Sequence, residues 1–280
     1  MAVKIITDSL SDITSSLAEE LGVTVVPLTV LFGHEQYLDR VTITTDEFYS
    51  RLINGNIWPT TTQPTPKTFA DVYDELLTET DEILVITVSS KLSGTYQSAV
   101  GAISMTEKKG RIEVINSEKV AMGLGLIVIT TARKANEGAS MDDLVKYVKN
   151  AINRSHFVVY FDTLTYLAKG GRIGKAKELM GSVLSIKQIL TIKDGEMTPL
   201  TRKRSLTAGM DYLYQHVQSF QKIGELAVEH TTAQGEADKL ADRVKSLAPD
   251  KHIYRSTVSP VLGVYGGPGA IAVTVLEAEK

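Results

Sequence analysis

The fold is decided by residues 83–99, which read ILVITVSSKLSGTYQSA. The first six, residues 83–88, form an apolar run rich in β-branched side chains, which is typical of a buried parallel strand. A Ser/Gly loop over residues 89–95 follows, and residues 96–99 resemble the opening of a helix. Backbone N–H groups are free at such a strand–loop–helix junction, so it can bind phosphate or carboxylate. The alternative is that Ser93 only caps the helix.

Strands and helices alternate on both sides of this stretch, which predicts an α/β fold. A strand over residues 3–7, a helix from about residue 13 to 21 and a strand over residues 23–28 form an opening βαβ unit. Parallel sheets bind ligands at the carboxyl ends of their strands, so we expect Asp8 and Ser9 to lie near the Ser93 loop. Asp12 is expected to cap the first helix rather than to pair with Asp8 in catalysis.

The second half of the chain has a different pattern. Residues 188–192 and 196–200 are two successive strand-like runs separated by Asp194-Gly195, which predicts a β-hairpin. At 280 residues the chain exceeds the usual single domain. We therefore predict an α/β domain over residues 1–154, with a mostly parallel sheet between helices and the Thr/Pro and Ser/Gly ligand loops. A smaller α+β domain with an antiparallel sheet is predicted over residues 155–280, with the ligand between the two domains.

The composition excludes several classes of protein. A hydrophobic content of 43% argues against disorder, and a net charge of −3 gives no electrostatic case for nucleic acid. The absence of cysteine excludes disulfides, a thiol nucleophile and cysteine-ligated zinc. The N-terminal residues have no signal-peptide layout, and the longest uncharged apolar stretch, residues 120–132, is too short to span a bilayer. We expect a soluble, cytoplasmic protein.

Two further stretches have the chemistry of a binding site. Residues 58–66, WPTTTQPTP, hold threonine hydroxyls between stiffening prolines, although the same pattern fits an ordinary linker. Residues 169–174, KGGRIG, could cradle a phosphate with Lys169 and Arg172, or could be an exposed glycine turn. This segment matches neither a Walker A loop nor the dinucleotide fingerprint.

Catalytic and metal-binding patterns are missing from the sequence. No nucleophile elbow, HExxH or kinase motif is present, so we predict no catalytic residue, no metal and no cofactor. The histidines lack ligand spacing and are expected to be structural; they are His34, His156, His216, His230 and His252.

Together, the motifs resemble the DegV family of fatty-acid-binding proteins. They are TTTQPT at 60–65, LSGTYQSA at 92–99, YLAKGGRIG at 166–174 and GVYGGPGA at 263–270, preceded by Thr7-Asp8-Ser9 and Asp12. These segments extend from residue 7 to residue 270, so the resemblance covers essentially the whole chain.

The resemblance implies a carrier rather than an enzyme. Such a protein holds a long-chain fatty acid and presents its carboxylate to a separate ATP-dependent fatty-acid kinase. The acyl phosphate then enters bacterial phospholipid synthesis, with at most transient membrane contact of the carrier. The expected carboxylate-binding residues are Thr61, Thr62, Ser93, Gly94 and Tyr265.

The family resemblance also concerns two arginines and one position at which this chain departs from the family pattern. Arg172 and Arg204 match family positions that suit the surface facing the kinase. Many members read G-x-H-x-G-P-G where this chain has Tyr265 in place of the histidine. A phenol can donate a hydrogen bond to a carboxylate, but unlike imidazole it cannot become a cation near neutral pH. The substitution therefore argues against a role of this position in phosphoryl transfer more than against a role in ligand binding. The alternative is that Tyr265 only packs against the tunnel wall.

A second function stays open at the level of sequence. The Ser93 loop and the KGGRIG turn could instead belong to an enzyme acting on a phosphorylated metabolite. Organic extraction separates the two, because only the carrier should release a fatty acid.

Overall fold

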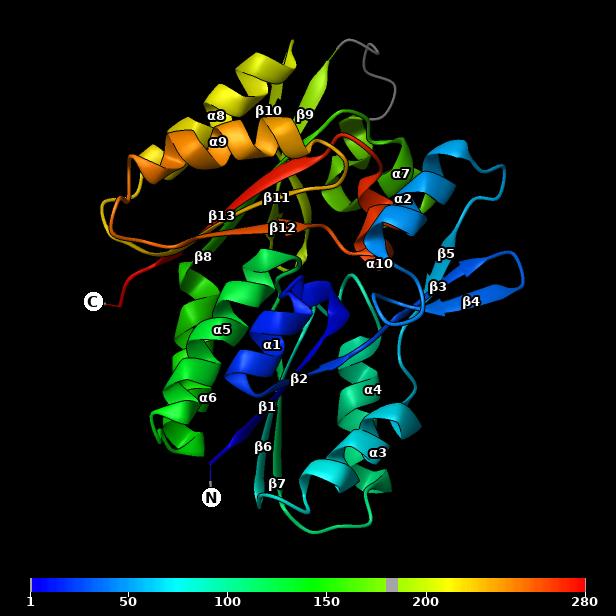
Figure 1. Cartoon of the computed structure of the whole chain (residues 1–280), viewed down its shortest axis with the longest axis vertical. Helices are drawn as coiled ribbons and strands as arrows, with labels where there is room; N and C mark the ends of the chain where they lie inside the picture. Colours follow the sequence, from blue (N-terminus) through cyan, green and yellow to red (C-terminus); the bar gives the residue numbers. More distant parts are fainter. Residues whose placement is uncertain (1, 180–185, 280) are drawn as a thin grey trace.

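A parallel sheet occupies the first half of the chain in the computed structural model, which describes residues 2–179 and 186–279 (Figure 1). Its strand order is β2 (Val23–Val26), β1 (Lys4–Asp8), β6 (Glu82–Thr87) and β7 (Arg111–Asn116). Strand β6 is buried from Ile83 onward, as its continuous apolar run predicts. The parallel sheet predicted from residues 83–88 is therefore confirmed.

A second sheet begins at Ser155. Its order is β10 (Glu196–Lys203), β9 (Lys187–Lys193), β8 (Ser155–Phe161), β13 (Ile271–Glu277), β11 (Ile223–His230) and β12 (Ile253–Thr257). Neighbouring strands are antiparallel except β11 and β12, which are parallel. The predicted hairpin is confirmed: Asp194 and Gly195 both have positive φ, 52° and 79°, as a tight turn requires.

Helices cover both sheets and also fill the space between them (Figure 1). On the outer face of the six-stranded sheet lie α8 (Leu206–Gln218) and α9 (Gln234–Lys245), and α3 (Pro66–Leu76) and α4 (Thr95–Ala102) pack on the parallel sheet. On the inner side lie α1 (Ser15–Leu21), α5 (Met122–Asn136) and α6 (Met141–Arg154). Helix α5 contacts β1 on one side and β8 and β13 on the other, within one continuous apolar core. The domain limits 1–154 and 155–280 stay a prediction, because this core joins the two parts.

A small antiparallel sheet, absent from the predicted fold, lies beside the first. Its order is β4 (Glu35–Leu38), β3 (Thr29–Phe32) and β5 (Thr60–Thr62), and α2 (Thr45–Asn54) connects β4 to β5. The threonine segment was predicted as a loop, and this is wrong for residues 60–62, which pair with β3. So short a strand depends on its neighbour for hydrogen bonds and leaves little periodic signal in the sequence.

The C-terminal glycine segment also differs from expectation. Residues 266–269 were predicted to form a bend before the last strand, whereas Gly266 is the final residue of α10 (Pro260–Gly266), a helix with proline in its first turn. The bend is confined to the residues that follow. Near it lies α7 (Thr165–Lys169), and single 3₁₀ turns span Ser9–Ser11, Ile103–Met105 and Gly174–Leu179.

The sequence predicts two helix starts from capping-box patterns, Thr44 with Glu47 and Ser140 with Asp143, and both are confirmed. Thr44 and Ser140 accept hydrogen bonds from the backbone N–H groups of Glu47 and Asp143, at 3.2 and 3.3 Å. The prediction that Asp12 caps the first helix is wrong, because the hydroxyl of Thr14 does so. Asp12 is fully buried, with a left-handed φ of 54°.

Within residues 2–179 and 186–279, no helix is both long enough and apolar enough to cross a bilayer.

Candidate functional site

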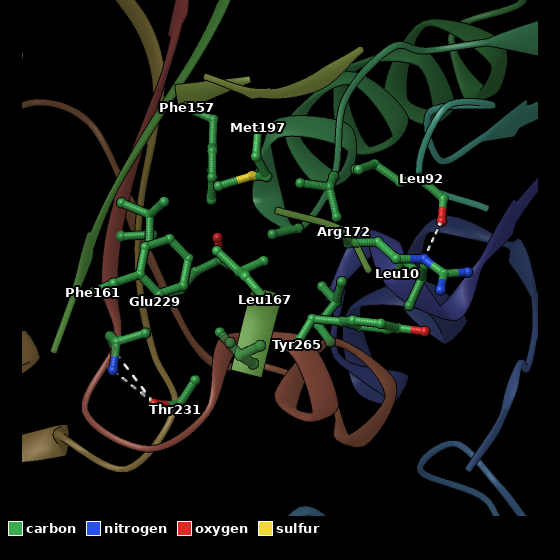
Figure 2. Close-up of a pocket in the computed structure, with 18 of the residues that line it drawn as sticks. Leu10, Leu92, Phe157, Phe161, Leu167, Arg172, Met197, Glu229, Thr231 and Tyr265 are labelled. Atoms are coloured by element: carbon green, nitrogen blue, oxygen red, sulfur yellow. Dashed lines mark hydrogen bonds between the residues drawn. The ribbon is translucent and has the colours of Figure 1, made fainter. Parts of the chain in front are cut away.

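An apolar cavity lies between the second sheet and the loops at the carboxyl end of the first (Figure 2). The cavity has a volume of about 90 Å³, which is room for several waters. Both halves of the chain contribute to its wall. The lining residues are Leu10, Leu92, Val120, Ala121, Phe157, Val159, Phe161, Leu167, Arg172, Met197, Glu229, Thr231, Val258, Leu262, Tyr265, Gly266, Ala270, Ile271 and Ala272.

Hydroxyl groups and one guanidinium gather where Tyr265 of α10 enters this wall. The hydroxyl of Tyr265 is hydrogen-bonded to that of Thr61 on β5. The guanidinium of Arg172 lies 5.0 Å from the centre of the Tyr265 ring, and its Nε donates to the carbonyl oxygen of Leu92 at 3.1 Å (Figure 2). This part of the cavity therefore combines hydroxyl donors with a positive charge.

The Ser93 loop lies against the threonine segment. At Gly94 an added Cβ would be 2.8 Å from Nε2 of Gln63, so the exposed side chain of Gln63 would have to move to admit another residue. Ser93 does not occupy the N-cap position of α4, which belongs to Gly94. Its hydroxyl instead lies 2.9 Å from the hydroxyl of Thr95. The two loops singled out in the sequence are thus neighbours in space.

The predicted site residues differ in their relation to the cavity. Tyr265 forms part of its wall, and Thr61 reaches it through the hydrogen bond to Tyr265. The side chain of Thr62 is exposed on β5. Their roles in binding, and those of Ser93 and Gly94, stay predictions.

The two arginines proposed to face a kinase occupy different surroundings. Arg204 is exposed in the bend after β10. Arg172 is also exposed but lines the cavity, so its position suits contact with a ligand as well as with a partner.

The side chain of Lys169 extends over an aromatic ring. Its ammonium lies 4.1 Å from the ring centre of Trp58, which stacks on Tyr166 at 4.8 Å. The lysine thus packs on an aromatic pair that joins α7 to the segment before β5.

A buried carboxyl cluster, formed by Asp8, Asp12, Asp39 and Glu229, was not predicted from the sequence. Burial raises the pKa of Asp8 and of Asp39 to about 7. Burial also raises the pKa of Asp12, against the opposing charge of Arg40. Burial, followed by the charge of Asp12, raises the pKa of Glu229 well above its usual range.

Hydrogen bonds give the cluster a structural role. Asp8 accepts from the backbone N–H groups of Leu10 and Val88, at 3.0 and 2.8 Å, and so joins the ends of β1 and β6. Asp8 lies beside the start of the Ser93 loop, as expected, but its carboxyl is fully buried and serves the backbone. A glutamate inside the apolar run Leu226-Ala227-Val228-Glu229 was the available sequence signal.

Metal-ligand geometry is not found among the described residues, where no three His, Cys, Asp or Glu side chains are grouped to hold an ion. His216 is largely buried, and burial lowers its pKa to about 4. Nε2 of His156 is hydrogen-bonded to Oε1 of Glu277 at 2.7 Å.

Known proteins share this architecture along its whole length. The chain is 37% identical over 275 residues to the DegV domain-containing protein TTE1491 of Caldanaerobacter subterraneus subsp. tengcongensis, covering 97% of each protein. The solved DegV protein of Bacillus subtilis, described as a fatty acid binding protein, matches with a TM-score of 0.92 and 26% identity over 99% of this chain and 100% of its own. A Thermus thermophilus DegV family protein, described in terms of its fatty acid binding, matches with a TM-score of 0.91 and 28% identity. The match covers 99% of this chain and 100% of the Thermus chain.

A family model described as "Uncharacterised protein, DegV family" matches residues 2–278. This match includes both large sheets, the cavity and every predicted site residue. The chain therefore belongs to the DegV family.

Proposed function

We propose that this protein binds a long-chain fatty acid, with the acyl tail in the apolar cavity and the carboxylate near Thr61, Ser93 and Tyr265. The observation that carries the proposal is an apolar cavity bordered by a hydrogen-bonded hydroxyl pair and a guanidinium. Each methylene taken out of water contributes about 0.8 kcal/mol, so the tail provides most of the affinity and the polar groups orient it. The fatty-acid binding described for the Bacillus and Thermus relatives supports the same ligand.

Extraction tests this proposal directly. Protein purified without added lipid is extracted with organic solvent, and the extract is analysed by mass spectrometry. We expect one equivalent of fatty acid per chain, and the delipidated protein should rebind palmitate or oleate. Protein that carries no fatty acid and fails to bind either acid would contradict the proposal.

The hydroxyl pair gives a sharper prediction. Tyr265→Phe should weaken fatty-acid binding by about 0.5–3 kcal/mol, because a donor to the carboxylate is lost. Thr61→Val should have a similar effect, and the double variant should lose less than the sum, since the two hydroxyls are bonded to each other. Isothermal titration of the delipidated variants measures all three, and additive losses would show that the hydroxyls act separately.

We further propose that the bound carboxylate is presented to a separate ATP-dependent fatty-acid kinase, which forms an acyl phosphate for phospholipid synthesis. The family resemblance of the KGGRIG segment and of the basic segment around Arg204 supports this role. In this proposal the protein is a cytoplasmic carrier and contributes no catalytic residue.

Charge reversal at the two arginines separates partner contact from ligand contact. Arg204→Glu should lower acyl-phosphate formation by a purified bacterial fatty-acid kinase about 3- to 10-fold, with fatty-acid retention unchanged, because Arg204 lies away from the cavity wall. Arg172→Glu should lower both, because Arg172 borders the cavity and contacts Tyr265. Loss of retention in Arg204→Glu, or full kinase turnover with both variants, would contradict this division.

An enzyme acting on a phosphorylated metabolite is the second candidate. The observation in its favour is the hydrogen bond from Arg172 to the carbonyl of Leu92, which joins the KGGRIG turn to the Ser93 loop. Release of a stoichiometric fatty acid on extraction would count against it.

A further inference from the structure

Helix α10 ends at the ligand site and begins at the buried carboxyl cluster. Tyr265 lies in the last turn of α10, and Ser259 occupies the N-cap position before its first turn. The backbone N–H of Ser259 donates to Oδ1 of Asp12 at 3.1 Å. The hydroxyl of Tyr49 donates to the carbonyl of Val258 at 3.0 Å. The start of α10 is thus fixed by groups from the first half of the chain.

Close packing also restricts the middle of this helix. A Cβ added at Gly263 would lie 2.4 Å from Cε1 of Phe48 and 2.8 Å from the hydroxyl oxygen of Tyr49. Helix α10 therefore rests directly on α2 and has little freedom to shift toward it. A displacement at its first residues would be transmitted along its short length to Tyr265.

Charged groups converge on the start of the helix from several elements. Asp12 and Asp39 approach it, and the backbone N–H of Val261 is close enough to lower the pKa of Asp39 against the larger effect of burial. Arg40 lies beside both carboxyls and donates to the carbonyls of Ile13 and Ser9 at 3.1 and 2.8 Å. The remaining titratable groups that face this region are Asp8, Tyr49 and Glu229.

The cluster retains polar atoms that no other group in the described structure satisfies. Oδ2 of Asp12, Oδ1 of Asp39 and the hydroxyls of Ser11 and Ser259 are buried without hydrogen-bond partners among the described residues. Burying several carboxyls around one guanidinium is costly, whereas a serine or threonine hydroxyl suffices to cap a surface helix. An arrangement this costly suggests a requirement for one defined position of α10.

The cluster also reaches the cavity. Glu229 is among the cavity-lining residues, and its Oε2 accepts from the backbone N–H of Met122 at 3.0 Å. Because the charge of Asp12 acts on Glu229, the cluster extends from the cavity wall to the start of α10.

We propose that Asp12 is a positioning residue that holds α10 so that the hydroxyl of Tyr265 meets Thr61 and the ligand's carboxylate. This inference rests on the proposed binding of a fatty acid. Asp12 does not touch the ligand in this scheme and acts through Tyr265.

A test compares the variants Asp12→Ala, Asp12→Asn and Tyr265→Phe, and the double variant Asp12→Ala/Tyr265→Phe. Each is loaded with a fatty acid carrying an isotope-labelled carboxyl carbon. The dissociation rate and the carboxyl resonance in NMR spectra are then measured. Asp12→Ala should accelerate dissociation about 5- to 100-fold and shift the resonance toward its position in Tyr265→Phe. Asp12→Asn should fall between, because an amide oxygen still accepts from Ser259.

The double variant decides whether the effect passes through Tyr265. In the Tyr265→Phe background, Asp12→Ala should change the rate by less than about twofold. Thr14→Ala, which removes the cap of the neighbouring α1 without touching α10, should change neither rate nor resonance. Should Asp12→Ala fail to fold, Asp12→Asn in the two backgrounds provides the same comparison, with a smaller expected change.

Equal acceleration in both backgrounds, or an unmoved carboxyl resonance, would overturn the positioning role while leaving fatty-acid binding intact. Wild-type protein that binds no fatty acid would instead refute the proposed function.

Discussion

Replacing Ala272 by phenylalanine should largely abolish fatty-acid binding while the protein stays folded. Ala272 lies on β13, is 3% exposed and lines the cavity. A phenyl ring there would occupy space proposed for the acyl tail. Excluding three or four methylenes from the cavity would cost about 2–3 kcal/mol of binding free energy. Titration of the delipidated variant with palmitate measures the loss.

A graded series makes this steric argument specific. Affinity should fall progressively from Ala272→Val to Ala272→Leu to Ala272→Phe, while Ala272→Ser, which changes volume little, should retain most of it. The melting temperature of each delipidated variant shows whether the fold survives the added bulk. If the phenylalanine variant bound palmitate as tightly as the parent, the tail would have to lie elsewhere.

Local signals were sufficient to predict the main sheets. The β-branched run at residues 83–88, the Asp194-Gly195 turn and the capping hydroxyls of Thr44 and Ser140 each act over a few residues, and the structure confirms all of them. The predictions were wrong where contacts with residues distant in sequence determine the local structure. Strand β5 exists because β3 pairs with it, and Thr14 rather than Asp12 caps α1 because the carboxyl of Asp12 is held by Ser259.

In the candidate site, too, local sequence predicted some features, and contacts between distant residues determine the others. Residue types identified the hydroxyl-rich loops, but Thr61 and Tyr265 are 204 positions apart, and only the family resemblance placed them in one site. The cavity depends on how apolar side chains from β8, β11, β13 and α10 pack, which no sequence period encodes. The buried carboxyl cluster was not predicted for a related reason: its members come from three separate segments, of which one holds both Asp8 and Asp12.

The cluster should make the protein more stable at pH 5 than at pH 8. The pKa of Asp39 is raised from 3.8 to about 7, so between these values the folded protein retains a proton that the unfolded chain has lost. This contribution to stability is therefore fully present below about pH 4 and is lost as the pH rises through about 7. Between pH 5 and pH 8 the loss corresponds to at most about 3 kcal/mol for Asp39, and Asp8 should act in the same direction.

Asp39→Asn should remove the Asp39 part of this pH dependence. The amide matches the carboxyl in shape, and its oxygen can still accept from the hydroxyl of Ser9, which lies 2.7 Å from Oδ2 in the parent. Urea unfolding of delipidated protein at pH 5, 6, 7 and 8 should therefore show the variant gaining stability relative to the parent as the pH rises. Asp250→Asn, at an exposed carboxylate, is the matched control and should differ from the parent equally at every pH. A constant difference for Asp39→Asn as well would mean that the buried carboxyl of Asp39 does not titrate in this range.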